Sequence, residues 1–261
     1  MAILERKDRG AIAHLTMNTP ANLNALSDAM LAELTAAFAA LETDRAIRVV
    51  VIAGAGKAFC AGHDLKEMTR ARAAPDGGAA AFADLFARCS AMMQAIPRLP
   101  QPVIAQVHGI ATAAGCQLVA SCDLAIAADD TRFGVNGVNI GLFCSTPMVA
   151  LSRNIPRKQA FEMLTTGDFI TADRAADLGL INRAVPSADL AQETADLADR
   201  IAAKLGTAVR IGKRAFYEQL NMDLAAAYAH TGAVMVENML RDDTADGIAA
   251  FLAKRPPAWN Q

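Results

Sequence analysis

A chain of 261 residues, of which 53% are apolar, can bury one sizeable core, and its length does not require a second domain. The formal net charge of -2 gives no basic surface suited to nucleic acid, so we expect no nucleic-acid partner. The five cysteines are odd in number and scattered, which favours a reducing, cytoplasmic compartment over a disulfide framework.

The sequence shows no segment suited to export or to crossing a membrane. Residues 5–9 are charged where a signal peptide would need an apolar segment. The most hydrophobic stretch, residues 103–128, is interrupted by polar side chains such as Gln106, His108 and Asp123. We therefore expect this stretch to form strands, a turn and a helix inside a core, with no membrane partner.

The chain up to the helix that follows residues 141–147 alternates between strand and helix patterns. Short apolar runs predict strands at residues 11–17, 48–53, 103–107 and 124–128. Apolar positions at helical spacing, with capping residues before them, predict helices at residues 28–42, 81–96 and 115–121, near Asp64 and after the turn at 141–147. The continuous apolarity of residues 48–53 is typical of a parallel strand that is covered on both faces.

Beyond Pro186 the pattern is nearly all helical. Amphipathic segments cover residues 190–205, 209–220, 224–240 and 245–253. We therefore expect an α/β core over residues 1–190 and a C-terminal helical region over residues 191–261.

Two short turns, residues 61–66 and 113–117, each follow an apolar β-run. Ligand sites of α/β proteins gather in such turns, at the C-terminal ends of the strands. The two turns could aim a backbone N–H group at the same carbonyl oxygen. Such a pair would form an oxyanion hole, which stabilises the enolate of a thioester.

The sequence around these turns resembles the crotonase superfamily of enoyl-CoA hydratases and isomerases over nearly the whole chain. The stretches that carry the resemblance are FCAGHDLKEM at 59–68, VIAQVHGIATAAGCQ at 103–117, Cys122-Asp123, Phe133-Gly134 and DGIAAF at 246–251. The stretches at 111–123 and 141–147 are most similar to a branch of enoyl-CoA hydratase domain-containing proteins. The resemblance implies a ClpP-like α/β spiral of ββα units, with a C-terminal helical region that builds homotrimers, often paired into homohexamers.

The resemblance implies roles for individual positions. The first oxyanion N–H belongs to His63, and the CoA-binding stretch comprises His63, Asp64, Leu65 and Lys66. The second N–H belongs to Ala114, where the family usually has glycine, so alanine fits only if its φ is negative or the strain is small. The resemblance then implies an acyl-CoA substrate, whose CoA moiety is bound as part of the substrate, and no separate cofactor.

Both acid/base residues of a hydratase are absent at the positions that match the family. Hydration needs one carboxylate to activate water and one carboxylic acid to protonate Cα, and each contributes about 10²–10⁴ in rate. The two glutamates of the resembling enzymes map to Gln117 and Gly137. We therefore expect an acyl-CoA thioester enzyme, by family a hydratase, in which hydration is impaired. Asp64 more simply caps the helix that follows it than replaces a glutamate.

Two other functions remain open. Cys144 precedes a helix N-terminus, where a thiol of lowered pKa can act as a nucleophile, and with Asn139 it could serve an acyl-CoA hydrolase, isomerase or other lyase. The plainer interpretation of Cys144 is a small buried side chain at a tight turn, because no histidine stands beside it in the sequence. The third function is a catalytically weak acyl-CoA-binding protein that kept the fold and lost turnover.

Charged and metal-ligating residues add one further expectation. Lys204, Arg210, Lys213 and Arg214 form a basic set suited to the phosphates of CoA, or alternatively a solvated helix face. The sequence contains neither His-Glu-x-x-His nor paired Cys-x-x-Cys motifs, so we expect no metal site.

Overall fold

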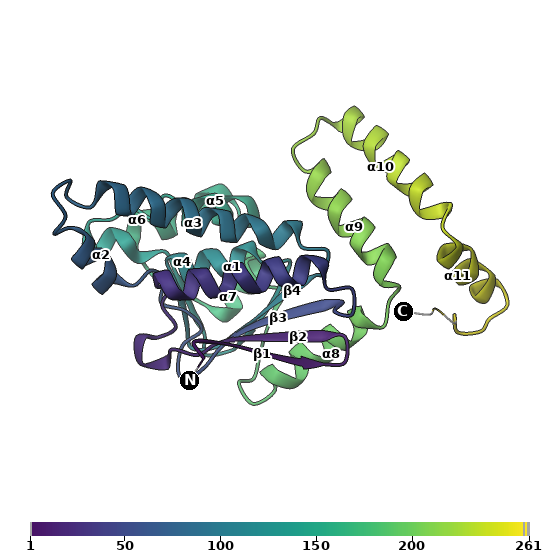
Figure 1. The fold of residues 1–261 in the computed structure, drawn as a ribbon, viewed down its shortest axis with the longest axis horizontal. Coiled ribbons are helices and arrows are strands. Elements are labelled where there is room, and N and C mark those ends of the chain that lie inside the picture. The colour runs from purple at the N-terminus through teal and green to yellow at the C-terminus, as the bar shows by residue number, and fades with distance from the viewer. Residues whose placement is uncertain (1, 258, 260–261) are drawn as a thin grey trace.

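The computed structural model describes residues 2–257 and 259 and contains two sheets (Figure 1). The main sheet has the strand order β1-β2-β3-β4-β6-β9, and every neighbouring pair is parallel except the β1–β2 hairpin. Its strands are β1 (Leu4–Arg9), β2 (Ile12–Met17), β3 (Val49–Gly54), β4 (Val103–Val107), β6 (Leu124–Ala128) and β9 (Arg183–Val185). The second sheet, of order β5-β7-β8, comprises β5 (Ile110–Thr112), β7 (Arg132–Gly134) and β8 (Ile170–Thr171).

Strand β3 is covered on both faces, as its continuous apolarity predicts. Val50 and Ile52 belong to the large core beneath α1 (Asp28–Thr43), α3 (Ala79–Arg98) and α4 (Ala114–Ser121). Val49 and Val51 point the other way and cluster with Ala198 of α8 (Leu190–Ala202). Side chains alternate between the two faces of a strand. When both faces are buried, every position is apolar, and the sequence is one continuous hydrophobic run.

Strand β1 is an element that the hydrophobic pattern does not predict. It lies at the edge of the sheet, pairs only with β2 and exposes charged residues such as Arg6 and Asp8. Arg6 pairs with Asp8 at 2.9 Å and with Asp44 at 2.7 Å. Charged edge strands discourage pairing between molecules, so their composition resembles that of a loop.

The remaining helices connect the strands or project from the body. The connecting helices are η1 (Pro20–Asn22), α2 (Leu65–Ala71), η2 (Asn136–Ile140), α5 (Pro147–Asn154), α6 (Arg157–Thr166) and α7 (Ala172–Leu178). The projecting helices are α9 (Gly206–Gln219), α10 (Leu224–Met239) and α11 (Asp242–Leu252) (Figure 1). None of the described helices combines the length and apolarity needed to cross a membrane.

The first helix of the expected C-terminal region packs against the main sheet. Helix α8 contacts β2, β3, β4 and β6, whereas α10 and α11 lie away from the sheet (Figure 1). The division between residues 190 and 191 stays a prediction, since α8 covers the core while belonging to the helical end of the chain.

Candidate active site

The two predicted turns lie side by side. The chain leading into the first turn pairs with β5, since the N–H of Cys60 donates to the carbonyl of Ile110 at 3.1 Å and that of Thr112 donates to Cys60 at 3.0 Å. A Cβ placed on Gly62 would lie 3.3 Å from the backbone nitrogen of Ala114. The turn containing His63 therefore contacts the start of α4.

Two backbone N–H groups at this junction are free to bind a ligand. Within residues 2–257 and 259, neither the N–H of His63 nor that of Ala114 donates to a protein acceptor. Ala114 is the first residue of α4, so its N–H also carries the partial positive charge of a helix N-terminus. These are the two groups that the sequence predicts as oxyanion donors.

The backbone strain expected at Ala114 falls one residue earlier. Ala114 is helical, whereas Ala113 has φ 49° and ψ -120°, a conformation that favours glycine. The N–H of Ala113 donates to the carbonyl of Gly134 at 2.9 Å, and its carbonyl accepts from Gln117 at 3.0 Å. These bonds hold Ala113 in this conformation, and the second donor keeps ordinary helical geometry.

Gln117 lies one turn along α4 from Ala114. Its side chain is only 6% exposed, and its Oε1 has no hydrogen-bond partner among the described residues. A buried acceptor without a partner is costly, so this oxygen favours a ligand or water that can donate to it. The amide is uncharged near neutral pH and cannot exchange a proton as a carboxylate would.

At Gly137, where the resemblance implies a glutamate in related enzymes, backbone and a cysteine fill the space of a side chain. Gly137 is buried in η2, and a Cβ there would overlap the carbonyl oxygen of Leu142 and lie 2.9 Å from Sγ of Cys144. The loop that follows therefore occupies the space that a side chain at this position would need.

Cys144, the candidate nucleophile of the alternative function, is not activated. The residue is 7% exposed, and burial raises the pKa of its thiol, against the lowering effect of a hydrogen bond from Gly137. Burial outweighs the nearby start of α5, which agrees with the plainer interpretation of Cys144 as a small buried side chain at a tight turn. Asn139, its suggested companion, donates through Nδ2 to the carbonyl of Gly167 at 3.3 Å.

The stretch assigned to CoA binding divides into structural and accessible residues. The Asp64 carboxylate caps α2 by accepting from the N–H groups of Lys66 at 2.8 Å and Glu67 at 3.2 Å, as predicted. The ring of His63 packs edge-on against Phe86, and burial lowers the pKa of its imidazole, so it is neutral near pH 7. Leu65 and Lys66 are exposed beside the free N–H groups.

The predicted basic set does not form one surface. Lys213 is 9% exposed, and its Nζ donates to Asp123 at 2.6 Å and to the carbonyls of Ile96 and Gln101 at 2.9 and 2.8 Å. Its assignment to CoA phosphates is wrong, since all three ammonium donors are used inside the protein. Tyr217, which sequence reasoning missed, also donates to Asp123 at 2.7 Å. Its position four residues after Lys213 on α9 is the signal that could have identified it.

A small cavity adjoins the first turn. Its volume is about 90 Å³, and it lies among α1, α2 and α3, with Met68, Phe82 and Leu85 as apolar lining. Glu67 also lines it, and its Oε2 accepts from the N–H of Asp28 at 2.8 Å. Glu67 is therefore committed to holding α2 against α1.

Comparison with known proteins gives the same relatives by sequence and by structure. A family model described as enoyl-CoA hydratase/isomerase matches residues 7–261. A crystal structure of an enoyl-CoA hydratase from Mycobacterium smegmatis is 53% identical, covers 100% of both chains and superposes with a TM-score of 0.96. The human mitochondrial enoyl-CoA hydratase domain-containing protein 3 is 45% identical over 249 residues, which are 95% of this chain and 80% of that protein.

These relatives correct the expected compartment and establish the family. The human and rat enoyl-CoA hydratase domain-containing proteins 3 are both named mitochondrial, which contradicts the expectation of a cytoplasmic protein. Scattered reduced cysteines do not distinguish two reducing compartments, so the sequence pattern could not decide between them. The family match spans nearly the whole chain, and the fold agrees with it. The chain is a member of the enoyl-CoA hydratase/isomerase family, within the crotonase superfamily.

Proposed function

We propose that this protein is an acyl-CoA thioester enzyme in which the N–H groups of His63 and Ala114 hold the thioester oxygen as negative charge develops on it. The main support is that both N–H groups lack an acceptor among the described residues and lie on adjacent turns, one of them at a helix N-terminus. Fixed donors of this kind contribute about 3–4 kcal/mol each in known oxyanion holes.

The turn that contains His63 also offers a binding place for the CoA moiety. Leu65 and Lys66 are exposed directly after His63, so an apolar and a cationic side chain flank the donor. CoA would be bound as part of the substrate, with no separate cofactor. The unpartnered Oε1 of Gln117 favours an acyl group or water that donates a hydrogen bond near the reacting carbons.

Replacing Gly62 by alanine is expected to remove polarisation of a bound thioester. The added Cβ would lie 2.9 Å from Cβ of Ala113 and 3.3 Å from the nitrogen of Ala114, at a φ of 90°. The two turns must therefore separate or tilt. In the wild type, binding should lower the carbonyl stretching frequency of crotonyl-CoA labelled with carbon-13 at the thioester, and Gly62→Ala should abolish that shift.

A matched control separates backbone strain from loss of the site. Gly10 has φ 57° with no atom within 4 Å of an added Cβ, so Gly10→Ala introduces strain without a clash. This variant should keep the wild-type frequency shift. A wild-type protein that binds crotonyl-CoA with an unshifted carbonyl would contradict the proposed oxyanion hole.

We further propose that the chain works as a homotrimer or homohexamer. Helices α10 and α11 project from the body and expose large apolar side chains (Figure 1). The most exposed are Leu224, Tyr228, Leu240, Phe251 and Leu252. An apolar surface of this kind usually marks an interface between proteins. Light scattering during gel filtration should give three or six times the 27.4 kDa chain mass, and a monomer would contradict this assembly.

A further inference from the structure

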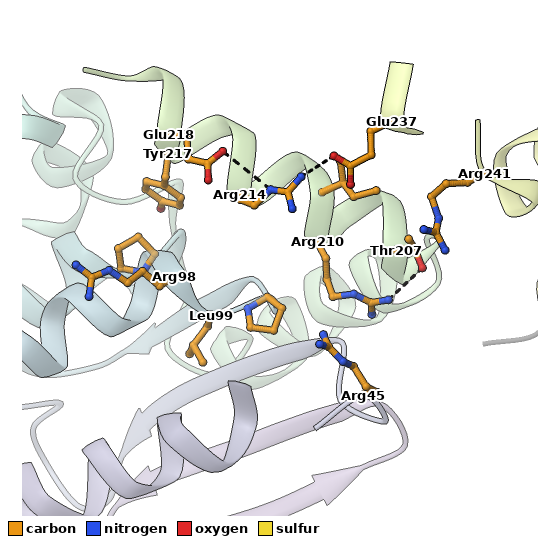
Figure 2. Close-up of a pocket in the computed structure, with 13 residues that line it drawn as sticks. Arg45, Arg98, Leu99, Thr207, Arg210, Arg214, Tyr217, Glu218, Glu237 and Arg241 are labelled. Carbon is orange, nitrogen blue, oxygen red and sulfur yellow. Dashed lines mark hydrogen bonds and ion pairs between the residues drawn. The ribbon is translucent and has the colours of Figure 1, made fainter. Parts of the chain in front are cut away.

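A cavity of about 490 Å³ lies between the body of the protein and the C-terminal helices (Figure 2). Its wall includes Arg45, in the loop before β3, and Leu99 and Pro100, before β4. These residues lead into the N-terminal ends of the two strands, whereas the oxyanion turns follow their C-terminal side. The cavity is therefore separate from the thioester site.

The cavity wall carries more cations than anions. Its charged residues are Arg45, Arg98, Arg210, Arg214, Arg241, Glu218 and Glu237. Both glutamates already have a cationic neighbour, because Glu237 accepts from Arg214 at 2.8 Å and Glu218 lies 4.0 Å from Nε of the same arginine. Figure 2 shows Arg214 between these two carboxylates.

Within the described part of the chain, Arg45, Arg98 and Arg210 have no carboxylate partner, and Arg241 has only a long ion pair. Arg210 donates to the hydroxyl of Thr207 at 3.0 Å, and Arg241 lies 3.8 Å from Asp243. Arg45 makes no hydrogen bond or ion pair within the described part of the chain. Burial lowers the pKa of Arg210, and the charges of Arg45 and Arg241 lower it further. Like charges of this kind repel unless an anion lies between them.

We propose that Arg45, Arg210 and Arg241 bind a phosphate group in this cavity, with help from the Thr207 hydroxyl. Guanidinium groups present planar, paired N–H donors that match phosphate oxygens, and several of them can share one doubly charged anion. Thr207 lies in the first turn of α9, so the positive end of a 14-residue helix adds to the same field. The ligand is inorganic phosphate or the terminal phosphate of a small metabolite.

Titration calorimetry with inorganic phosphate at low ionic strength tests this site on the full chain. The wild type should bind phosphate saturably, and the double variant Arg45→Gln/Arg210→Gln should bind it at least about tenfold more weakly, since two charge-assisted contacts are lost. Arg153→Gln removes one exposed positive charge on α5 and should bind like the wild type. The same titration is repeated with adenosine monophosphate. If it binds as tightly as inorganic phosphate, the ligand is the terminal phosphate of a small metabolite. If it binds more weakly, the ligand is inorganic phosphate.

Thermal unfolding separates a binding site from a structural cluster. Without phosphate, Arg210→Gln should unfold at the wild-type temperature or above it, because the substitution relieves repulsion. With phosphate, the wild type should gain stability and the double variant should not. The double variant should still shift the carbonyl frequency of crotonyl-CoA, so this site and the oxyanion hole can fail independently. A wild type without saturable phosphate binding, or a double variant that binds like the wild type, would overturn the proposal.

Discussion

Replacing Gly137 by glutamate is expected to destabilise the fold without creating an efficient hydratase. The new Cβ would overlap the carbonyl oxygen of Leu142 and approach Sγ of Cys144 to 2.9 Å. Overpacking of a buried site costs about 1–3 kcal/mol, and here the obstruction includes backbone, which has little freedom to move. Urea unfolding should show the lower stability, and the absorbance of crotonyl-CoA should show hydration no faster than in the wild type.

Gln117→Glu provides the matched variant, because it changes charge and protonation at nearly constant shape. Gln117 already occupies its buried position on α4, so this substitution meets no new atom. The double variant Gln117→Glu/Gly137→Glu should still hydrate crotonyl-CoA slowly, since its second carboxyl lacks space. A tenfold gain in hydration rate from either variant that carries the glutamate at 137 would show that the loop can accept a carboxyl group.

Replacing Lys213 by methionine is expected to lower the free energy of unfolding by about 3–5 kcal/mol, the usual cost of breaking a buried ion pair from one side. Asp123 would remain only 12% exposed without its cation, and the carbonyls of Ile96 and Gln101 would lose a donor. Because Lys213 lies on α9 and Asp123 lies between α4 and β6, the loss should also weaken the attachment of the C-terminal helices. Urea unfolding measures the change.

Two comparisons identify the buried charge as the cause of that loss. Lys204→Met removes an exposed lysine just before α9 and should change the unfolding free energy by less than about 0.5 kcal/mol. Adding Asp123→Asn to Lys213→Met should recover part of the stability, since it removes the uncompensated charge. If Lys213→Met costs no more than Lys204→Met, the ion pair does not stabilise the fold.

The parts of the fold that follow from local pattern were predictable. The first long helix, for which the sequence offers Ser27 or Asp28 as the cap, is capped by Ser27 and begins at Asp28, and β4 and β6 have the predicted bounds. Edge strand β1 is charged, and β5, β7 and β8 have only two or three residues each, so periodicity could not reveal them. Their pairing depends on contacts between distant parts of the chain.

The candidate site likewise contains features that local sequence pattern predicts and features that depend on contacts between distant parts of the chain. The two turns could be found because a strand end followed by small residues is a local signal, and the family resemblance singled out His63 and Ala114 within them. The structure brings these two residues into neighbouring turns. The burial of Lys213 could not be found, because a lysine on an amphipathic helix carries no mark of its buried partner. The filled space at Gly137 likewise depends on how the loop through Cys144 folds back.

The left-handed backbone at Ala113 has a consequence for how firmly the second donor is aimed. Glycine would relieve the strain at φ 49°, which costs about 1–3 kcal/mol in such cases, but it would also open many other backbone conformations. Alanine has fewer conformations to lose on folding and fewer to visit afterwards. Once the bonds to Gly134 and Gln117 fix it, the peptide that precedes Ala114 has little rotational freedom. The alanine therefore costs the fold some stability but fixes the direction of the Ala114 N–H, the proposed second donor, in the folded protein itself.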